Sequence, residues 1–274
     1  MYTIIIYVIT PVLFALIFWF YLRPAWLRIK KKIQQVCTCG YLPPPPSKKE
    51  LIIMKIVSNF VVWLQVGKVR VSGIENISCD LPKIIIPNHS HYLDPFVIGI
   101  SVSENIRYMA AKGLLEVGGG LGGLIFSRYG AFCTDLRPGE GGPALRSAIQ
   151  ILKSDQTLLM FPEGWANMDG VMRPFKEGMI TVAKGACVKS GKKIHIIPAH
   201  LRYGKYVNSK IRLLPITAQC LILLFGFPYF RRGVYVCFGK PNLVDELSKD
   251  RSIATSYIQN VVKKLGDKCI QSFS

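Results

Sequence analysis

The chain has 274 residues, half of them hydrophobic, and its 35 Lys and Arg against 16 Asp and Glu give a formal net charge of +19. This length can bury a sizeable core, and the basic excess favours an anionic partner. Because the basic residues are spread along a very apolar chain instead of grouped with aromatic residues, we expect an anionic membrane or a phosphorylated substrate and no nucleic acid.

The first segment has the pattern of a membrane anchor. Residues 3–22 carry no charge, and as a helix they would span about 30 Å, the thickness of the hydrocarbon layer. A basic flank at residues 23–32 follows, which predicts a downstream chain on the cytoplasmic side. No basic residue precedes the apolar stretch and no small-residue cleavage site follows it, which favours a retained single-pass anchor over a cleaved signal peptide. We assign residues 1–32 to this anchor and its flank.

Residues 33–67 are predicted to form a linker and an interfacial helix. Four consecutive prolines at 43–46 are typical of a stiff, extended connection. Ile53, Ile56, Phe60 and Trp63 recur at roughly helical spacing, which predicts a helix over 50–66 that lies on the domain or on the bilayer surface. Lys55 interrupts this stretch and makes a second transmembrane helix the weaker alternative.

Strands alternate with helices over residues 68–274, which predicts one globular α/β domain with a mixed central sheet covered by helices. The expected strands are 68–71, 83–87, 107–110, 157–161, 194–198 and 234–238, and the expected helices are 143–153, 176–188 and 253–265. In the last helix Ile253, Tyr257, Val261 and Leu265 recur every four residues. Residues 213–230 carry no charge, and we expect them to dip into the near leaflet, because a crossing would remove the 234–238 strand from the sheet.

The eight cysteines include no C-x-x-C pair, which argues against a zinc ribbon. We predict reduced thiols on the cytosolic side, several of them in the core. The glycine-rich residues 118–123 match neither a Walker A nor a dinucleotide motif, and they are predicted to form a flexible connection. No serine lies in a G-x-S-x-G elbow, which argues against a serine hydrolase.

His89 and Asp94 lie between an expected strand and an expected helix. On one regular helix they would point about 140° apart, so they can meet only if His89 lies in the turn and Asp94 opens the helix. Asp94-Pro95 is typical of an N-cap followed by proline. Either Asp94 only caps the helix, or it orients His89 as a general base. His91 could share a metal with His89, but no third ligand is evident, so we predict no metal site.

A second motif, Phe161-Pro162-Glu163-Gly164, follows the expected strand 157–161. Open α/β sheets bind ligands at the carboxyl ends of their strands, so Glu163 is a candidate binding residue. The alternative is a simple turn that ends the strand, which proline and glycine would form in any case.

Together, Asn88-His89-x-x-x-x-Asp94 and the later Phe161-Pro162-Glu163-Gly164 closely resemble two motifs of the glycerolipid acyltransferases, the PlsC or lysophosphatidic acid acyltransferase superfamily. Gly130-Ala131-Phe132 with Arg137 nearby is similar to the family's second motif. Residues 174–178, 196–199 and 238–241 are similar to later family segments.

The resemblance implies transfer of a fatty acyl group from acyl-CoA or acyl-carrier protein to the free hydroxyl of lysophosphatidate or another lysophospholipid, without a cofactor. His89 would take the hydroxyl proton, Asp94 would orient His89, and no acyl-enzyme would form. The residues that the resemblance makes candidates for substrate binding are Asn88, Arg137, Glu163, Gly164, Arg173, Lys176 and Pro198.

Two departures from the family pattern leave the acceptor open. Phosphatidate-forming members commonly have F-P-E-G-T-R, whereas Trp165-Ala166 replaces the last pair here, so Arg173 or Lys176 is the candidate substitute for the missing phosphate-binding arginine. Arg137 is displaced by one residue. Asn167-Met168 also resembles tafazzin-like members, which exchange acyl chains between phospholipids without CoA. A different alternative is a non-enzymatic, basic membrane-binding protein in which His89 is structural.

Overall fold

The computed structural model describes residues 23–77, 82–204, 218 and 233–271. The expected anchor at 3–22 lies outside these residues, as does the expected leaflet segment at 213–230 apart from residue 218. No helix within the described ranges combines the length and the apolar character needed to cross a bilayer.

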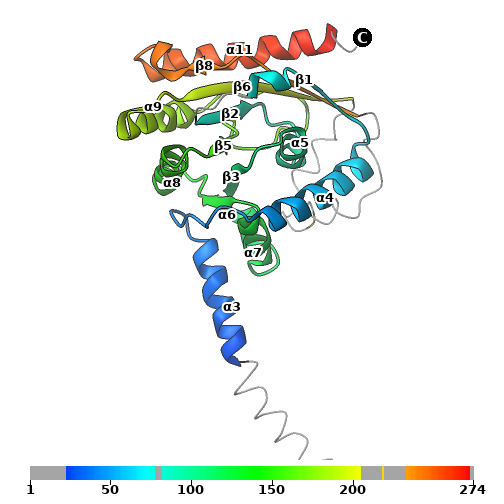
Figure 1. Cartoon of the computed structure of the whole chain (residues 1–274), viewed down its shortest axis with the longest axis vertical. Coiled ribbons are helices and arrows are strands. Elements are labelled where there is room, and N and C mark those ends of the chain that lie inside the picture. Colours follow the sequence, from blue (N-terminus) through cyan, green and yellow to red (C-terminus); the bar gives the residue numbers. More distant parts are fainter. Residues whose placement is uncertain (1–22, 78–81, 205–217, 219–232, 272–274) are drawn as a thin grey trace, which may run out of the picture.

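The described chain forms an eight-stranded sheet, and the predicted mixed α/β fold is confirmed (Figure 1). The strand order is β1-β7-β6-β2-β5-β3-β4, with β8 paired to β6. The β6–β7 and β6–β8 pairs are antiparallel and the others are parallel. The strands are β1 Val69–Ser72, β2 Lys83–Pro87, β3 Ile106–Ala111, β4 Ala131–Thr134, β5 Thr157–Leu159, β6 His195–Tyr203, β7 Val234–Phe238 and β8 Asn242–Leu243.

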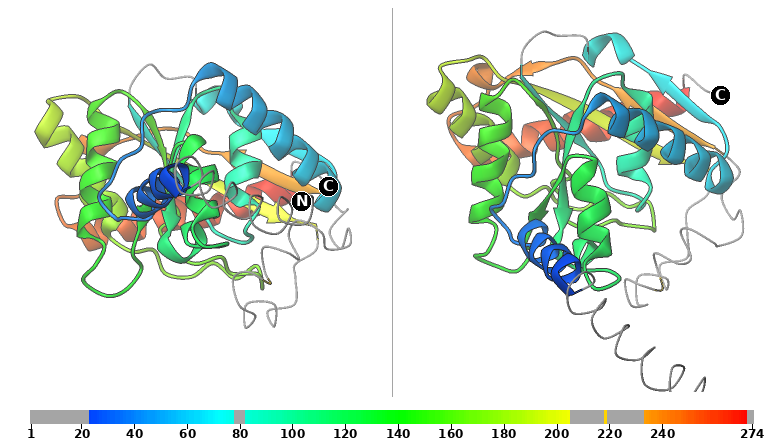
Figure 2. Two further views of the ribbon diagram at one scale, coloured as in Figure 1. Left: turned by 90° about the horizontal axis from the view of Figure 1, so that it is seen from below. Right: turned by 60° about the horizontal axis from the view of Figure 1, so that its bottom comes forward.

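Helices cover both faces of this sheet, as the views in Figure 2 show. The helices are α3 Arg23–Val36, α4 Lys48–Gln65, α5 Asp94–Ser101, α6 Lys112–Leu115, α7 Leu121–Arg128, α8 Gly142–Lys153, α9 Gly178–Ser190 and α11 Arg251–Gln271, with short 3₁₀ turns at Ile74–Ile77 and Val244–Glu246. The central strand β2 shows why helices are needed on both faces of the sheet. Ile84 and Ile86 pack with α8, α9 and α11, whereas Ile85 packs with α4 and α5, because successive side chains of a strand point to opposite faces.

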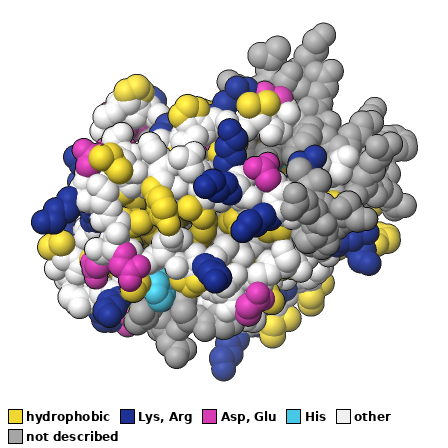
Figure 3. Space-filling view, turned by 90° about the horizontal axis from the view of Figure 1, so that it is seen from above, with side chains coloured by type: hydrophobic (Ala, Val, Ile, Leu, Met, Phe, Trp, Pro, Cys, Tyr) yellow, Lys and Arg dark blue, Asp and Glu magenta, His cyan; other side chains and the backbone are white. Residues whose placement is uncertain are grey.

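The last helix packs through a different face from the one that carries Ile253 and Tyr257. Ala254, Ile258 and Val262 of α11 are buried against the sheet, whereas Ile253 and Tyr257 are exposed. Two apolar stripes run side by side on this helix, and periodicity alone does not say which one meets the core. Seen from the α11 side, hydrophobic side chains lie among Lys and Arg side chains at several separate places (Figure 3).

Helix α4 carries an apolar stripe that points away from the core. The helix starts at a capping box, in which the Ser47 hydroxyl accepts from the Glu50 N–H and the Glu50 carboxylate accepts from the Ser47 N–H at 2.9 Å. Its buried face is Met54, Ser58, Val62 and Gln65. The exposed stripe is Ile52, Ile53, Ile56, Val57, Phe60 and Trp63. The predicted helix is therefore present, and its predicted apolar face does not pack on the described domain.

The proline-rich linker is fixed to the sheet by Arg107. This side chain of β3 is almost fully buried; its guanidinium donates to the carbonyl of Pro43 at 2.5 Å and to that of Gly130 at 3.0 Å. Burial lowers the pKa of Arg107 to about 10. The linker has no regular secondary structure, and it is held in place by a buried cation that the sequence pattern did not reveal.

The glycine-rich connection between α6 and α7 is closely packed at Gly122, where α7 begins, and its flexibility stays a prediction. Gly118, Gly119 and Gly120 all have positive φ, which non-glycine residues rarely adopt. A Cβ on Gly122 would lie 2.5 Å from the carbonyl oxygen of Leu114, so no larger residue fits where the two helices meet.

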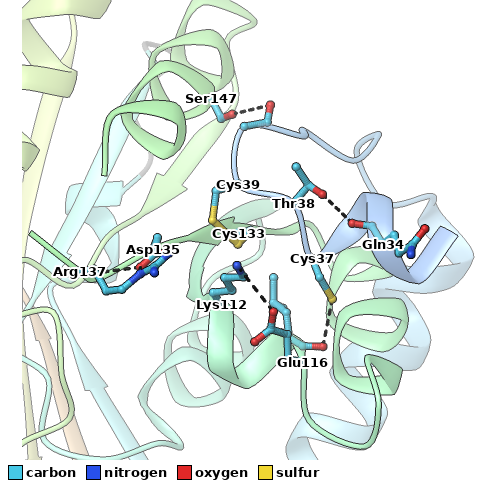
Figure 4. The surroundings of a disulfide bond; sticks show 12 residues. Gln34, Cys37, Thr38, Cys39, Lys112, Glu116, Cys133, Asp135, Arg137 and Ser147 are labelled. Atoms are coloured by element: carbon cyan, nitrogen blue, oxygen red, sulfur yellow. Dashed lines mark hydrogen bonds and ion pairs between the residues drawn. A yellow bond between two sulfur atoms is a disulfide. The ribbon is translucent and has the colours of Figure 1, made fainter. Parts of the chain in front are cut away.

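The prediction that all cysteines are reduced is wrong for four of them. Disulfides join Cys39 to Cys133 and Cys237 to Cys269, and among the described cysteines Cys37 and Cys187 are free. The paired residues are 94 and 32 positions apart, so local spacing gave no sign of them. Figure 4 shows the first disulfide, which links the proline-rich segment to β4.

Candidate active site

His89 and Asp94 meet at the carboxyl end of β2. The strand ends at Pro87, His89 lies in the following turn, and α5 begins at Asp94, which is the arrangement that their spacing requires. The His89 Nδ1 lies 2.9 Å from the Asp94 Oδ2. The Asp94 side chain is fully buried, whereas the His89 side chain is 14% exposed. The pair therefore has a buried carboxylate at one end and an accessible imidazole at the other.

The Asp94 carboxylate organises the loop rather than capping the helix. The cap residue of α5 is Leu93, which makes no side-chain capping bond, so the predicted N-cap is wrong by one position. Asp94 points back into the loop, where its Oδ2 accepts from the backbone N–H of Ser90 at 2.7 Å and of His91 at 2.9 Å. Its Oδ1 accepts from the hydroxyl of Tyr203 at 2.6 Å. These bonds hold the carboxylate in one orientation toward His89.

The hydrogen bonds assign the proton on the His89 ring. An ionised carboxylate only accepts, so Nδ1 carries the hydrogen and Nε2 is the basic nitrogen. No described residue bonds to Nε2. The imidazole stacks on the ring of Phe161, with centroids 4.0 Å apart and planes 25° from parallel. The stacking and the bond to Asp94 together fix the ring, and Nε2 is the ring nitrogen that is not bonded to the buried carboxylate.

Glu163 clamps the His89 loop to the turn after β5. Its Oε1 accepts from the His89 N–H at 2.7 Å, and its Oε2 accepts from the Asn167 side-chain amide at 2.5 Å and the Arg173 N–H at 2.7 Å. The Asn167 N–H donates back to the His89 carbonyl at 2.7 Å. Burial raises the pKa of Glu163, and the three donors and His89 oppose that rise. Glu163 therefore positions His89 and has both oxygens bonded within the protein.

Lys176 is the candidate cation that the structure places at this turn. Gly164 has a φ of +81°, and a Cβ there would lie 2.8 Å from the Lys176 Nζ. The ammonium group therefore lies directly over the turn, next to Glu163. The side chain of Arg173, in contrast, pairs with Asp169 at 2.6 Å and is half exposed. Of the two candidate substitutes for the missing arginine, Lys176 lies beside Gly164 and Arg173 is paired with Asp169.

Asn88 and Pro198 have structural positions that do not support their predicted binding roles. The Asn88 amide is buried; it donates to the Leu201 carbonyl at 3.0 Å and accepts from the Leu201 N–H at 2.7 Å. Pro198 is buried within β6, opposite Ile86 of β2. Asn88 bonds the β2 loop to β6, and Pro198 lies inside the sheet. Because both residues are buried among protein neighbours, neither offers a free surface to a substrate.

Arg137 is not brought to the histidine. It follows β4, which lies three places from β2 in the sheet, or about 14 Å at the usual strand spacing. Its guanidinium pairs with Asp135 at 2.6 Å, and this contact lowers the pKa of Asp135 to about 2. Figure 4 shows the pair beside Lys112 and the first disulfide. The second-motif arginine thus lines a separate hollow in the described structure, together with Lys112, Glu116 and Asp135.

The main residue missed by the sequence prediction is Tyr203. The strand was expected to end at Pro198, whereas β6 continues to Tyr203. A signal was present, because Ala199, Leu201 and Tyr203 alternate with two polar residues, which is the period of a strand with one buried face. What the sequence could not indicate is that this tyrosine reaches Asp94.

No group of three metal-ligating side chains forms among the described residues.

We expect His91 to make the fold less stable in mild acid. Burial lowers the pKa of His91 from 6.5 to about 4. Between those values the unfolded chain takes up a proton that the folded chain does not, so stability is intact at neutral pH and is lost as the pH falls from 6.5 to 4, by roughly 3 kcal/mol. Burial also lowers the pKa values of His195 and His200. Urea unfolding of the native chain and of His91→Gln, measured between pH 4 and 7, isolates the contribution of His91 to the pH dependence of the unfolding free energy. If that free energy falls equally steeply with pH in both proteins, the prediction for His91 is refuted.

Comparison with known proteins identifies the family. The family model described as Acyltransferase matches residues 68–202, a range that contains both motifs, β2, β5 and all of β6 except Tyr203. Residues 68–202 therefore form a domain of the PlsC-like glycerolipid acyltransferase superfamily. The family resemblance carried by the two motifs is thereby confirmed.

Individual relatives of this acyltransferase chain are distant. The chloroplastic 1-acyl-sn-glycerol-3-phosphate acyltransferase LPAT1 of Arabidopsis thaliana is 27% identical over 42% of this chain and 32% of its own length. The 1-acyl-sn-glycerol-3-phosphate acyltransferase of Borreliella burgdorferi is 27% identical over 52% of this chain and 55% of its own. This chain therefore spans between about a third and somewhat over half of these relatives.

The crystal structure of the 1-acyl-sn-glycerophosphate acyltransferase PlsC of Thermotoga maritima superposes with a TM-score of 0.54, at 22% identity over 78% of this chain and 77% of that one. At this level of identity the likeness supports the fold. The α/β sheet and its helical cover are thus shared with a solved member of the superfamily.

Proposed function

We propose that this protein transfers a fatty acyl group from a thioester donor, acyl-CoA or acyl-carrier protein, to the free hydroxyl of lysophosphatidate or a related lysophospholipid. The observation that carries the proposal is the 2.9 Å contact between His89 Nδ1 and the buried Asp94 carboxylate, which leaves Nε2 of the partly exposed imidazole as the basic nitrogen. This is the geometry of a histidine general base held by a carboxylate.

The chemistry follows from that geometry. His89 Nε2 takes the proton of the acceptor hydroxyl while the oxygen of that hydroxyl attacks the thioester carbonyl carbon. Asp94 stabilises the imidazolium that forms. The tetrahedral intermediate then collapses, the carbon–sulfur bond breaks, and the proton held by His89 leaves with the thiol. An ester and a free thiol result, without an acyl-enzyme. A thioester is already activated, so a positioned base and correct orientation supply much of the required acceleration.

The acceptor site is proposed at the turn after β5. Glu163 is occupied by protein donors, so the acceptor's anionic group is assigned to the exposed Lys176, whose ammonium lies over Gly164. A lysine can bind phosphate as a point charge but lacks the fork of an arginine. This arrangement fits lysophosphatidate and also fits other lysophospholipids with an anionic head group.

Membrane attachment is part of the proposal. The exposed stripe of α4, which includes Ile53, Ile56 and Phe60, has the character of a helix that lies in the bilayer interface. The uncharged residues 3–22 and their basic flank support a single-pass anchor with the domain on the cytoplasmic side. The bilayer would then supply both the lysophospholipid and a path for acyl chains.

The test is acyl transfer by the purified full-length chain. It is assayed in detergent or vesicles with labelled acyl-CoA or acyl-carrier protein against lysophosphatidate and lysophospholipids with other head groups. The proposal expects labelled diacyl product that depends on the thioester donor. Transfer from a phospholipid in the absence of any thioester would favour the tafazzin-like alternative, and no transfer to any acceptor would reject the proposed function.

A further inference from the structure

We propose that Tyr203 is a positioning residue for the histidine–carboxylate pair: its hydroxyl fixes the Asp94 carboxylate and tunes how firmly that carboxylate holds a proton on His89. The inference rests on the proposed function, because His89 is assigned there as the general base. It adds a residue from β6 that lies 109 positions beyond Asp94 in the chain.

The two oxygens of Asp94 have separate partners. Oδ2 accepts from His89 Nδ1 and from the backbone N–H groups of Ser90 and His91. Oδ1 accepts from the Tyr203 hydroxyl at 2.6 Å, a short contact of the kind formed between a hydroxyl and a charged acceptor. A carboxylate bonded through one oxygen alone can rotate about its last torsion, whereas bonds at both oxygens define its plane. Tyr203 therefore adds a bond at the second oxygen to the three that hold Oδ2 beside His89, and so fixes the plane of the carboxylate.

Tyr203 is itself held rigidly. It is the last residue of β6 and pairs with Val234 of β7. Its side chain is 3% exposed and lies in the apolar cluster that includes Val62 and Leu93, and its ring lies 5.2 Å from that of His91, tilted by 38°. A buried ring packed on several sides keeps its hydroxyl in one direction. The donor to Asp94 is thus preorganised by the sheet and not by the loop that carries His89.

The hydroxyl also acts on charge. A hydrogen bond donated to a buried carboxylate draws off part of its negative charge. Removal of that donor leaves a more basic carboxylate, which holds a proton on His89 more firmly, and the base is then neutral only at higher pH. The titratable groups around Asp94 are His89 and His91 of its own loop and Tyr203 and His200 of β6, with Glu163 one contact further through His89. Of these, His89 and Tyr203 bond to the carboxylate through their side chains.

The test is the pH profile of kcat for Tyr203→Phe, which removes one oxygen and keeps the ring. We expect kcat to fall about tenfold, KM to change little, and the acidic limb of the profile to move up by about 0.5 to 1 pH unit. The matched control is Tyr235→Phe, on the neighbouring strand β7, where the lost hydroxyl partners Arg70 at 2.9 Å. The control should keep the native profile. A purely structural role would lower kcat in Tyr203→Phe without moving the limb, and that result would overturn the proposal.

Two further variants decide whether Tyr203 acts through Asp94. In an Asp94→Asn background, Tyr203→Phe should lower kcat by less than about twofold, because the carboxylate that it tunes is gone. A full tenfold loss in that background would contradict the proposal. Replacement of Tyr203 by 3-fluorotyrosine strengthens the donor and should move the limb to lower pH, and this variant also covers the case in which the phenylalanine variant fails to fold.

Failure of this inference differs from failure of the proposed function. If the native chain transfers no acyl group, the proposed function is rejected before any tyrosine variant is compared. If the native chain is active and Tyr203→Phe matches it in kcat and in the position of the acidic limb, only the role of Tyr203 is rejected.

Discussion

His89→Ala should lower the rate of acyl transfer by roughly 10²- to 10⁴-fold, the range for loss of a general base. The imidazole is the group whose accessible nitrogen can take the proton of the acceptor hydroxyl, and its other nitrogen is bonded to Asp94 at 2.9 Å. The fold should survive, because the backbone of His89 keeps its bonds to Glu163 and Asn167. The measurement is kcat with labelled thioester and lysophosphatidate, together with the thermal unfolding midpoint.

The matched control for this variant is His195→Gln. His195 opens β6 and pairs in register with Lys83 at the start of β2, so it lies at the opposite end of the strands from His89. We expect nearly native transfer by the control. Undiminished transfer by a correctly folded His89→Ala protein would show that another group is the base, and equal losses in both variants would indicate a general effect on the fold.

Asp94→Asn should lower kcat by about 10³- to 10⁴-fold, on the scale seen when the orienting carboxylate of a catalytic triad becomes an amide. The buried carboxylate accepts four hydrogen bonds, three through Oδ2 and one through Oδ1. An amide nitrogen in either place would meet a donor, so at least one of these bonds is lost, and the amide cannot stabilise an imidazolium by charge. The histidine then loses both its orientation and its counter-ion.

The control is Asp155→Asn, whose carboxylate pairs with Lys192 at the surface. Exposed pairs of this kind contribute little, so we expect native kcat and stability. If Asp94→Asn retained most of the native kcat, the carboxylate would be a structural anchor for the loop alone, and the general-base arrangement would have to be abandoned.

Much of the fold could be predicted from local pattern, because a buried strand consists of apolar residues that can be recognised in the sequence. Residues 83–87 and 234–238 were predicted with the bounds that β2 and β7 have. Periodicity was less informative where a helix has two apolar stripes: on α11 the periodic Ile253 and Tyr257 are exposed, whereas Ala254 and Ile258 face the sheet. Which stripe is buried depends on the shape of the surface that the helix meets.

The sequence by itself indicated the family through its two motifs, and it placed His89 five residues before Asp94, at the turn between β2 and α5. Only the tertiary structure decided what holds that pair in place. Glu163 bonds to His89 across 74 residues and Tyr203 to Asp94 across 109, and Arg137 proved to lie three strands away from β2. These relations depend on strand order, which brings distant segments together, and local periodicity contains no information about which strands become neighbours.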